Sequence, residues 1–231
     1  MQNVSRQFAQ PKKSDRKMKL KLIYILLIVF NYPVFSQEKK EVIKSNELEA
    51  EVSPNGKIVN GVYICNLFDW NIEIPEGYVI TEIKRIEELE KKGHEASAIP
   101  KGMQIRKNPP HLIGFEKDKK NTFSSSFEPL EGNKKMTLEE NKNFVAQILS
   151  DTYSKVAGLK FELNKSDVKI GKYNFYNIEV KLYNAKTNQL ILTQEFYNSY
   201  INNHLFSVSI NYVNEDEGML LTYNFLKSLN K

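Results

Sequence analysis

The sequence predicts an α+β fold in which a central antiparallel sheet of about six strands is flanked by helices. Three observations predict it. Segments with alternating apolar and polar residues follow one another after residue 160 and are joined by short polar turns. Three other segments place apolar residues at spacings of three and four, as amphipathic helices do. Helices alternate with antiparallel runs of strands, and no series of parallel strands with Gly-rich turns is present, so the pattern favours a sandwich over a nucleotide-binding doubly wound sheet.

Residues 1–36 have the pattern of a secretory signal. A basic stretch ends at Lys21, the apolar run Leu22–Phe30 follows, and Val34-Phe35-Ser36 precedes Gln37 as a cleavage site. The apolar run is shorter than the roughly 20 residues that cross a bilayer, so we expect no permanent membrane span. Met18 gives a more ordinary signal length than Met1 and is the expected start. The predicted location is outside the cytoplasm, either periplasmic or extracellular.

The rest of the chain divides into a polar segment, 37–56, expected to be a flexible linker, and one α+β sandwich domain, 57–231. The formal net charge of +5 belongs to the leader: residues 1–36 contain seven Lys and Arg and one acid. The other 26 basic and 27 acidic residues leave a net charge of −1 for 37–231. This balance gives no electrostatic case for nucleic-acid binding.

The domain is predicted to begin with the strands Ile58–Cys65 and Asp69–Ile74. In the second strand Trp70, the only tryptophan, alternates with polar residues, and Pro75-Glu76-Gly77 ends it in a turn. Trp70 is therefore expected to be buried in the core and not to wait for a ligand. Cys65, the only cysteine, is expected to be a small buried apolar residue. A helix capped by Thr81 follows and is predicted to end at Gly93.

After an irregular segment, 96–110, the remaining elements follow in order. They are the strands His111–Glu116 and Thr122–Glu128, the helix Leu138–Ala157, the strands Asn174–Tyr183, Leu190–Tyr200 and His204–Val213, and the helix Glu215–Leu229. Thr137 with Glu140, and Asn214 with Glu217, form capping boxes at the starts of the two helices. The expected packing side of the last helix is Leu220, Tyr223 and Leu226.

The segment Phe68-x-Trp70-x-Ile72-x-Ile74-Pro75-Glu76-Gly77-Tyr78, together with this order of elements, resembles the PsbP-like group of α/β sandwiches. That group includes plant photosystem II extrinsic proteins, a yeast Ran-binding relative and many exported bacterial proteins. The resemblance covers about residues 57–230. It implies a central antiparallel sheet flanked by helices and a protein that acts by binding partners, and it implies no catalytic residues.

Candidate site residues are few. The three histidines, His94, His111 and His204, have no metal-ligand spacing, so no metal and no cofactor is expected. His111, His204 and the strand carboxylate Glu195 are the binding candidates, on condition that the fold brings them together. Aromatic residues of the last strands could stack sugars or bases, but we expect them to be cross-strand aromatic pairs that stabilise the sheet. Those residues are Tyr173, Phe175, Tyr176, Tyr183, Phe196, Tyr197 and Tyr200.

Three functional hypotheses follow. The first is an exported, non-catalytic binding or assembly-support protein with a protein partner in the envelope or outside the cell. The alternative is an enzyme that handles a small molecule or glycan, with a site formed by the 96–110 loop and the aromatic strands. A secreted surface or virulence-type factor differs from the first only in its destination.

Overall fold

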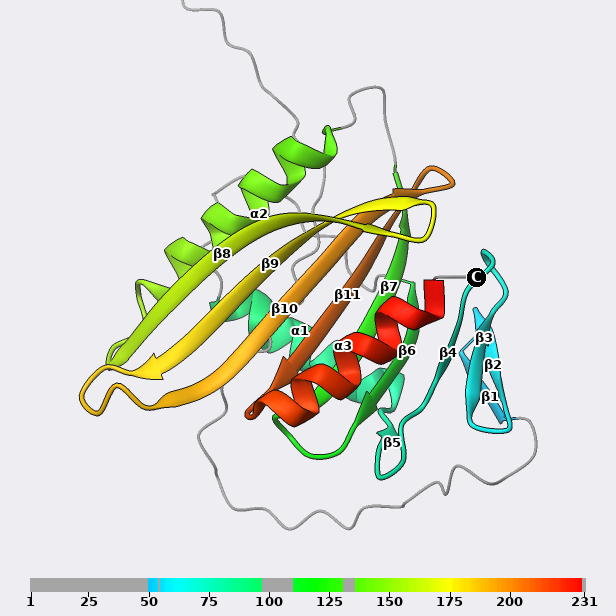
Figure 1. The fold of residues 1–231 in the computed structure, drawn as a ribbon, viewed down its shortest axis with the longest axis horizontal. Coiled ribbons are helices and arrows are strands. Elements are labelled where there is room, and N and C mark those ends of the chain that lie inside the picture. The colour runs from blue at the N-terminus through cyan, green and yellow to red at the C-terminus, as the bar shows by residue number, and fades with distance from the viewer. Residues whose placement is uncertain (1–49, 54, 97–109, 131–135, 230–231) are drawn as a thin grey trace, which may run out of the picture.

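The structure is a computed structural model that describes residues 50–53, 55–96, 110–130 and 136–229. Its main element is a seven-stranded sheet in the order β5-β6-β7-β11-β10-β9-β8, in which every pair of neighbours is antiparallel (Figure 1). These strands are β5 (Val79–Ile80), β6 (His111–Glu116), β7 (Thr122–Pro129), β8 (Leu159–Ile170), β9 (Tyr173–Asn184), β10 (Leu190–Ile201) and β11 (His204–Tyr212).

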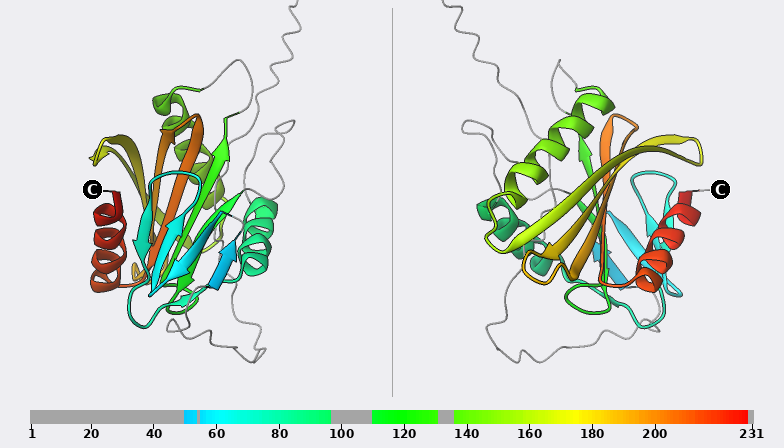
Figure 2. Two further views of the ribbon diagram at one scale, coloured as in Figure 1. Left: turned by 90° about the vertical axis from the view of Figure 1, so that its right-hand side faces the viewer. Right: turned by 60° about the vertical axis from the view of Figure 1, so that its left-hand side comes forward.

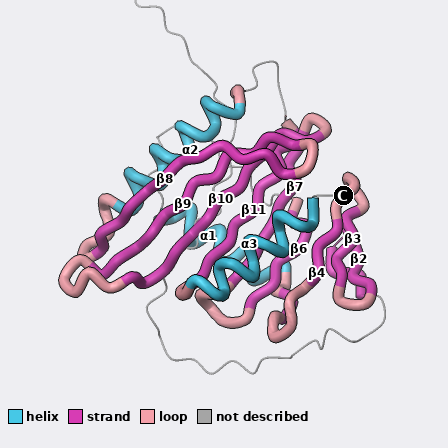
Figure 3. Tube along the Cα trace, in the orientation of Figure 1, coloured by secondary structure: helices cyan, strands magenta, loops and turns pink. Residues whose placement is uncertain are grey.

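A second, four-stranded antiparallel sheet stands beside the first (Figure 3). It is formed in chain order by β1 (Ala50–Ser53), β2 (Gly56–Val59), β3 (Val62–Cys65) and β4 (Asn71–Glu73). The helices are α1 (Ile83–Ala96), α2 (Leu138–Tyr153) and α3 (Glu215–Leu229). As Figure 2 shows, α1 and α2 lie on one face of the large sheet, and α3 lies on the other.

Two apolar cores occupy the two faces of the large sheet. The larger core joins the small sheet, α3 and the large sheet, and it centres on Trp70, which is 1% exposed. The Trp70 ring packs edge-to-face against Phe206, with ring centroids 5.0 Å apart, and its Nε1–H donates to Ser228 Oγ at 2.9 Å. The second core lies between α2 and strands β8 to β10 and includes Leu149, Ile178 and Phe196. The predicted burial of Trp70 is therefore confirmed.

The predicted fold class is confirmed, since the sheet is antiparallel and helices flank it. Its width is seven strands, close to the expected six. Cys65 is buried with a free thiol, as expected, and burial raises the pKa of that thiol. The capping box of α2 is also confirmed, because Thr137 Oγ1 accepts from the Glu140 N–H at 3.1 Å and the Thr137 N–H donates to Glu140 Oε2 at 2.8 Å.

The start of the domain differs from the prediction. Ile58–Cys65 is not one strand but the hairpin β2–β3, turned by Asn60 and Gly61 with φ of 51° and 76°. Asn-Gly is the favoured two-residue turn of a hairpin because both positions require positive φ. The strand β1 and the first residue of β2 lie within 37–56, so that part of the expected linker is sheet; residues 37–49 and the predicted signal at 1–36 lie outside the described residues.

Two helix ends also differ. The helix α1 continues through Gly93 to Ala96, since one glycine costs a helix only about 1 kcal/mol. The helix α2 ends at Tyr153 and not at Ala157. Beyond it the amides of Lys155 and Val156 donate to carbonyls three residues back, which makes tight turns in place of a further helical turn.

Candidate functional site

The first turn of α3 is fixed to the large sheet by polar contacts. Asn214 Oδ1 accepts from the Glu217 N–H at 3.0 Å, which confirms Asn214 as the N-cap. The second bond of the predicted capping box is replaced by other contacts. The Glu217 carboxylate accepts from the Tyr78 hydroxyl at 2.6 Å and pairs with Lys117. Lys117 first, and then Tyr78, hold the pKa of Glu217 below its ordinary value.

The packing side predicted for α3 is wrong for Leu220 and Tyr223, and only Leu226 of the three packs against the core. The helix buries Gly218, Leu221, Asn224, Phe225, Ser228 and Leu229, whereas Leu220 is 42% exposed and Tyr223 is 67% exposed. Both faces of this helix are apolar, so contacts elsewhere decide between them. A Cβ at Gly218 would lie 2.5 Å from the Tyr212 ring, so the absence of a side chain there permits close approach. At the C-terminal end of the helix, Ser228 Oγ accepts a hydrogen bond from the indole N–H of Trp70.

The remaining side of the helix is an exposed apolar surface. We call it the outward face of α3; it comprises Asp216, Met219, Leu220, Tyr223 and Lys227. Met219 is 63% exposed, whereas Leu226, at the margin of this face, is half-buried and packs against the larger core. Figure 1 shows α3 lying across the front of the large sheet. Sequence reasoning recognised part of this stripe as apolar but assigned it to the core.

Glu195, one of the three predicted binding candidates, lies under α3 and is 8% exposed. Its carboxylate accepts from the hydroxyls of Tyr197 at 2.6 Å, Tyr212 at 2.8 Å and Thr222 at 3.3 Å. Burial, reinforced by the Glu195 charge, raises the pKa of both tyrosines far above the ordinary value, so these hydroxyls keep their protons. The arrangement joins α3 to β10 and β11.

The two histidine candidates lie at other points of the sheet. His111 begins β6 and is 4% exposed, with its carbonyl accepting from Asn55 Nδ2 at 2.9 Å. His204 begins β11, where its ring stacks on Phe127 with centroids 4.3 Å apart and its Nδ1 lies 2.7 Å from the Asn202 carbonyl oxygen. Glu195 is paired with Ile210, six residues along β11 from His204, which separates them by roughly 20 Å. The structure does not bring the three candidates together.

Other expected site features are placed as follows. Among the described residues there is no group of three or more His, Cys, Asp and Glu side chains that could hold a metal ion. Of the seven aromatic residues considered for stacking, Phe175, Tyr176, Phe196 and Tyr197 are buried in the two cores. Residues 97–109 of the proposed 96–110 loop, and the side chain of His94, lie outside the described residues.

The face of the large sheet that carries α1 and α2 has a buried polar strip that sequence reasoning missed. We call it the polar layer; it comprises Thr122, Ser124, Ser126, Gln194, Asn198, Ser209 and Asn211, all less than 9% exposed. Strand register places them side by side: Asn211 lies opposite both Thr122 and Gln194, and Ser209 lies opposite Ser124. Alternation places the polar residues of β11 on the face opposite its apolar residues. The structure shows that this second face, which carries α1 and α2, is covered as well.

A chain of hydrogen bonds crosses the polar layer. The Tyr153 hydroxyl of α2 donates to Gln194 Oε1, Gln194 Nε2 donates to Asn211 Oδ1 at 2.7 Å, and Asn211 Nδ2 donates to Thr122 Oγ1 at 3.0 Å. Burial raises the pKa of Tyr153, so its hydroxyl remains a donor at neutral pH. Each of these buried amides has its partners, which is the condition for a polar group to be tolerated inside a protein.

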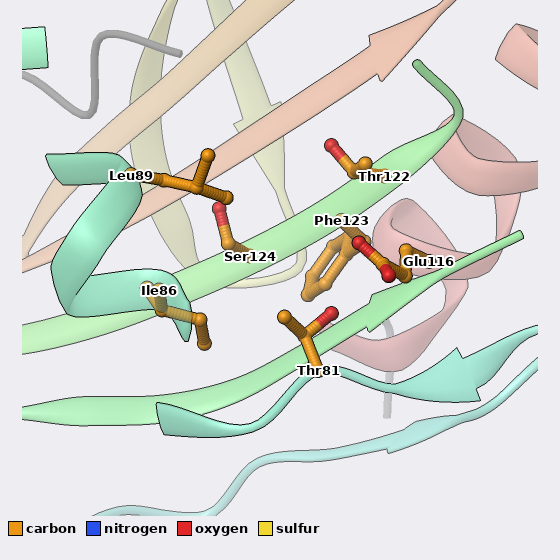
Figure 4. Close-up of a pocket in the computed structure, with 7 residues that line it drawn as sticks. All are labelled: Thr81, Ile86, Leu89, Glu116, Thr122, Phe123 and Ser124. Atoms are coloured by element: carbon orange, nitrogen blue, oxygen red, sulfur yellow. The ribbon is translucent and has the colours of Figure 1, made fainter. Parts of the chain in front are cut away.

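The layer ends at a small cavity. Its volume is about 20 Å³, and it is lined by Thr81, Ile86, Leu89, Glu116, Thr122, Phe123 and Ser124. Figure 4 shows Ile86 and Leu89 projecting from α1 toward the strand that carries Thr122 and Ser124. The buried hydroxyls of Ser124 and Ser209 have no hydrogen-bond partner within the described part of the chain. Such a cavity has room for about one water molecule and none for a sugar.

A signal for the polar layer exists in the sequence. The residues are neutral and short, whereas a strand face turned to water usually carries Lys and Glu. On β8, the exposed edge strand, the residues that face water include Lys160, Glu162 and Lys169. The contrast between charged and neutral polar residues therefore separates an exposed strand face from a covered one.

Comparison with protein-family models and with curated proteins finds no match. Among solved structures, the chain is similar to the solution structure of cyanobacterial PsbP (CyanoP) from Synechocystis sp. PCC 6803. The identity is 10%, the TM-score is 0.46, and the match covers 73% of this chain and 87% of that chain. The neighbour is a PsbP protein, from the group that the Phe68–Tyr78 segment resembles, and the similarity is one of fold alone. Within the described residues, none of the helices has the length and apolar character needed to cross a membrane.

Proposed function

We propose that the protein is an exported, non-catalytic binding or assembly-support protein that contacts a protein partner through the outward face of α3. The observation that carries this proposal is the exposure of Met219, Leu220 and Tyr223 on a helix whose opposite side is already buried in the core. Grouped exposed apolar side chains are typical of interaction sites, and Met and Tyr are enriched in interfaces.

Two further observations support the proposal. The helix is held in place at both ends, by Glu217 and by Ser228, and beneath its middle by Thr222, which donates to Glu195. A surface held in this way loses little conformational entropy on binding. Export is supported by the basic and apolar pattern of residues 1–36, and the charge of −1 for residues 37–231 favours a protein partner over a nucleic acid.

Site-specific photo-crosslinking in the cells that make the protein tests the proposal. A photoreactive amino acid at Tyr223 should give discrete protein adducts in the envelope or the medium, and these should disappear when Leu220→Asp is added. The control position is Val156, which is 40% exposed in the turn after α2, on the other face of the sheet. The proposal fails if position 223 gives no adducts, if Leu220→Asp leaves them unchanged, or if position 156 gives the same ones.

A further inference from the structure

The outward face of α3 has a self-complementary pattern. Asp216, Leu220, Tyr223 and Lys227 follow one another at spacings of four, three and four residues. At 3.6 residues per turn, these spacings place all four side chains along one line of the helix. An acid therefore stands at one end of the line, a base at the other, and two large apolar side chains between them.

The line is symmetric about the middle of the helix, between Leu221 and Thr222. Rotation by 180° about an axis through that point exchanges the position of Asp216 with that of Lys227, and the position of Leu220 with that of Tyr223. Two copies of α3 that pack antiparallel about this axis therefore place each aspartate against the lysine of the other copy. They also place each leucine against the tyrosine of the other copy. This match of charge and of apolar side chains favours a second copy as the partner.

We infer that the partner bound by the outward face of α3 is a second copy of this chain, joined through an antiparallel helix pair; this rests on the proposed function. The contact is isologous, so it closes with two copies and does not extend into a filament. The opposed helix dipoles add to the attraction between the ends.

The charged ends of the line are available for this contact. Asp216 is exposed. Lys227 lies 3.7 Å from Glu73, and the two side chains are 57% and 64% exposed. A pair this exposed contributes little to stability, so Lys227 exchanges it readily for a partner across the interface.

The dimer is expected to be weak, because α3 has only 15 residues. A stable interface of ordinary size buries about 800 Å² on each partner, more than one short helix presents. Sedimentation velocity of the purified protein over a range from about 1 to 500 µM is therefore the suitable measurement. We expect one concentration-dependent transition from monomer to dimer.

Charge exchange tests the arrangement. Asp216→Lys and Lys227→Asp should each weaken association roughly tenfold, because each change brings like charges together at both symmetric ends. The double variant Asp216→Lys/Lys227→Asp should restore the wild-type association, since it only reverses the direction of each pair. Leu220→Asp should abolish the dimer, and Val156→Asp, on the other face, should leave it unchanged. Circular dichroism of each variant controls for folding.

A wild-type protein that stays monomeric at 500 µM overturns the inference, as does a double variant no better than the single ones. The crosslinks from position 223 separate this failure from failure of the proposed function. Adducts with a different protein that depend on Leu220, together with a monomeric sedimentation profile, exclude the second copy and leave the binding function standing. A monomer without any adducts contradicts both.

Discussion

The hydrogen-bond chain across the polar layer makes a sharp prediction about two residues of β11. Asn211 and Ser209 are two positions apart on the same face and are 1% and 3% exposed. Asn211→Ala removes the partners of Gln194 Nε2 and Thr122 Oγ1, which lie 2.7 and 3.0 Å from its amide. An unsatisfied buried polar group costs about 1–3 kcal/mol, so we expect a loss of roughly 3 kcal/mol in the free energy of unfolding.

Ser209→Ala removes a hydroxyl that has no hydrogen-bond partner among the described residues. The substitution breaks no bond and relieves the cost of burying that oxygen. We therefore expect a change between zero and about 1 kcal/mol in favour of the folded state. Asn211→Leu serves as a second variant, because its side chain has the same branched shape and no smaller volume but leaves the same two polar groups without partners.

Urea unfolding measures all three variants, and equal m-values would show that the midpoints compare stability alone. For a domain of this size, a loss of 3 kcal/mol should also lower the melting temperature by about 6–12 °C. Equal losses for Asn211→Ala and Ser209→Ala would refute the reasoning, since the two positions match in burial and strand face and Asn211→Leu controls for the larger volume that the asparagine loses. A near-normal Asn211→Leu would show that the alanine variant lost volume and not polar contacts.

Three further predictions follow from single contacts. Gly218→Ala should destabilise the protein by about 1–2 kcal/mol in thermal unfolding, because the new Cβ would lie 2.5 Å from the Tyr212 ring. The clash outweighs the roughly 1 kcal/mol of helix propensity that alanine adds. A variant more stable than the wild type would contradict this prediction. Glu217 has a lowered pKa in the folded protein, so its ionised carboxylate contributes to stability above the ordinary pKa of 4.5. This contribution is lost as the pH falls through the pKa of the folded state. Lys117→Met should therefore flatten the fall of stability below pH 4.5, and an unchanged slope in acid unfolding would count against the pair. Cys65 is 8% exposed with a raised thiol pKa, so a thiol reagent should label it only in denaturant, and rapid labelling of the native protein would disprove its burial.

The elements that local patterns determine were predictable from sequence. The helix that begins after Thr137 has a recognisable cap, and the strands β9, β10 and β11 have strong periodicity; the structure has all four close to the predicted positions. The pattern of Ile58–Cys65 predicts one strand and not the pair β2 and β3, because each of these has only four residues. The Asn60-Gly61 turn between them was the available signal.

The orientation of α3 could not be read from its own residues. Leu221, Phe225 and Leu229 form one apolar face, and Leu220, Tyr223 and Leu226 form another. The choice depends on contacts with residues distant in sequence, such as the ring of Tyr212 against Gly218 and the indole of Trp70 against Ser228.

The candidate site was harder to predict than the fold. His111, His204 and Glu195 were selected by chemistry, and only the strand register shows that they lie apart. The outward face of α3 was visible as an apolar stripe, but its exposure follows from the orientation of the helix. The polar layer was missed because alternation alone equates polar with exposed, and that rule fails when both faces of a sheet are covered.

The hydrogen bond from Trp70 to Ser228 has a consequence for how the chain acquires its core. The two residues are 158 positions apart in the sequence. At about 5–20 residues per second, a ribosome adds Ser228 roughly 8–30 s after Trp70. During that interval Phe225 and Leu229, which cover the same core, are also missing, so the aromatic cluster around Trp70 cannot close while the chain is being made. For the exported role proposed above, this delay would favour export, since the core around Trp70 stays open until synthesis is nearly complete.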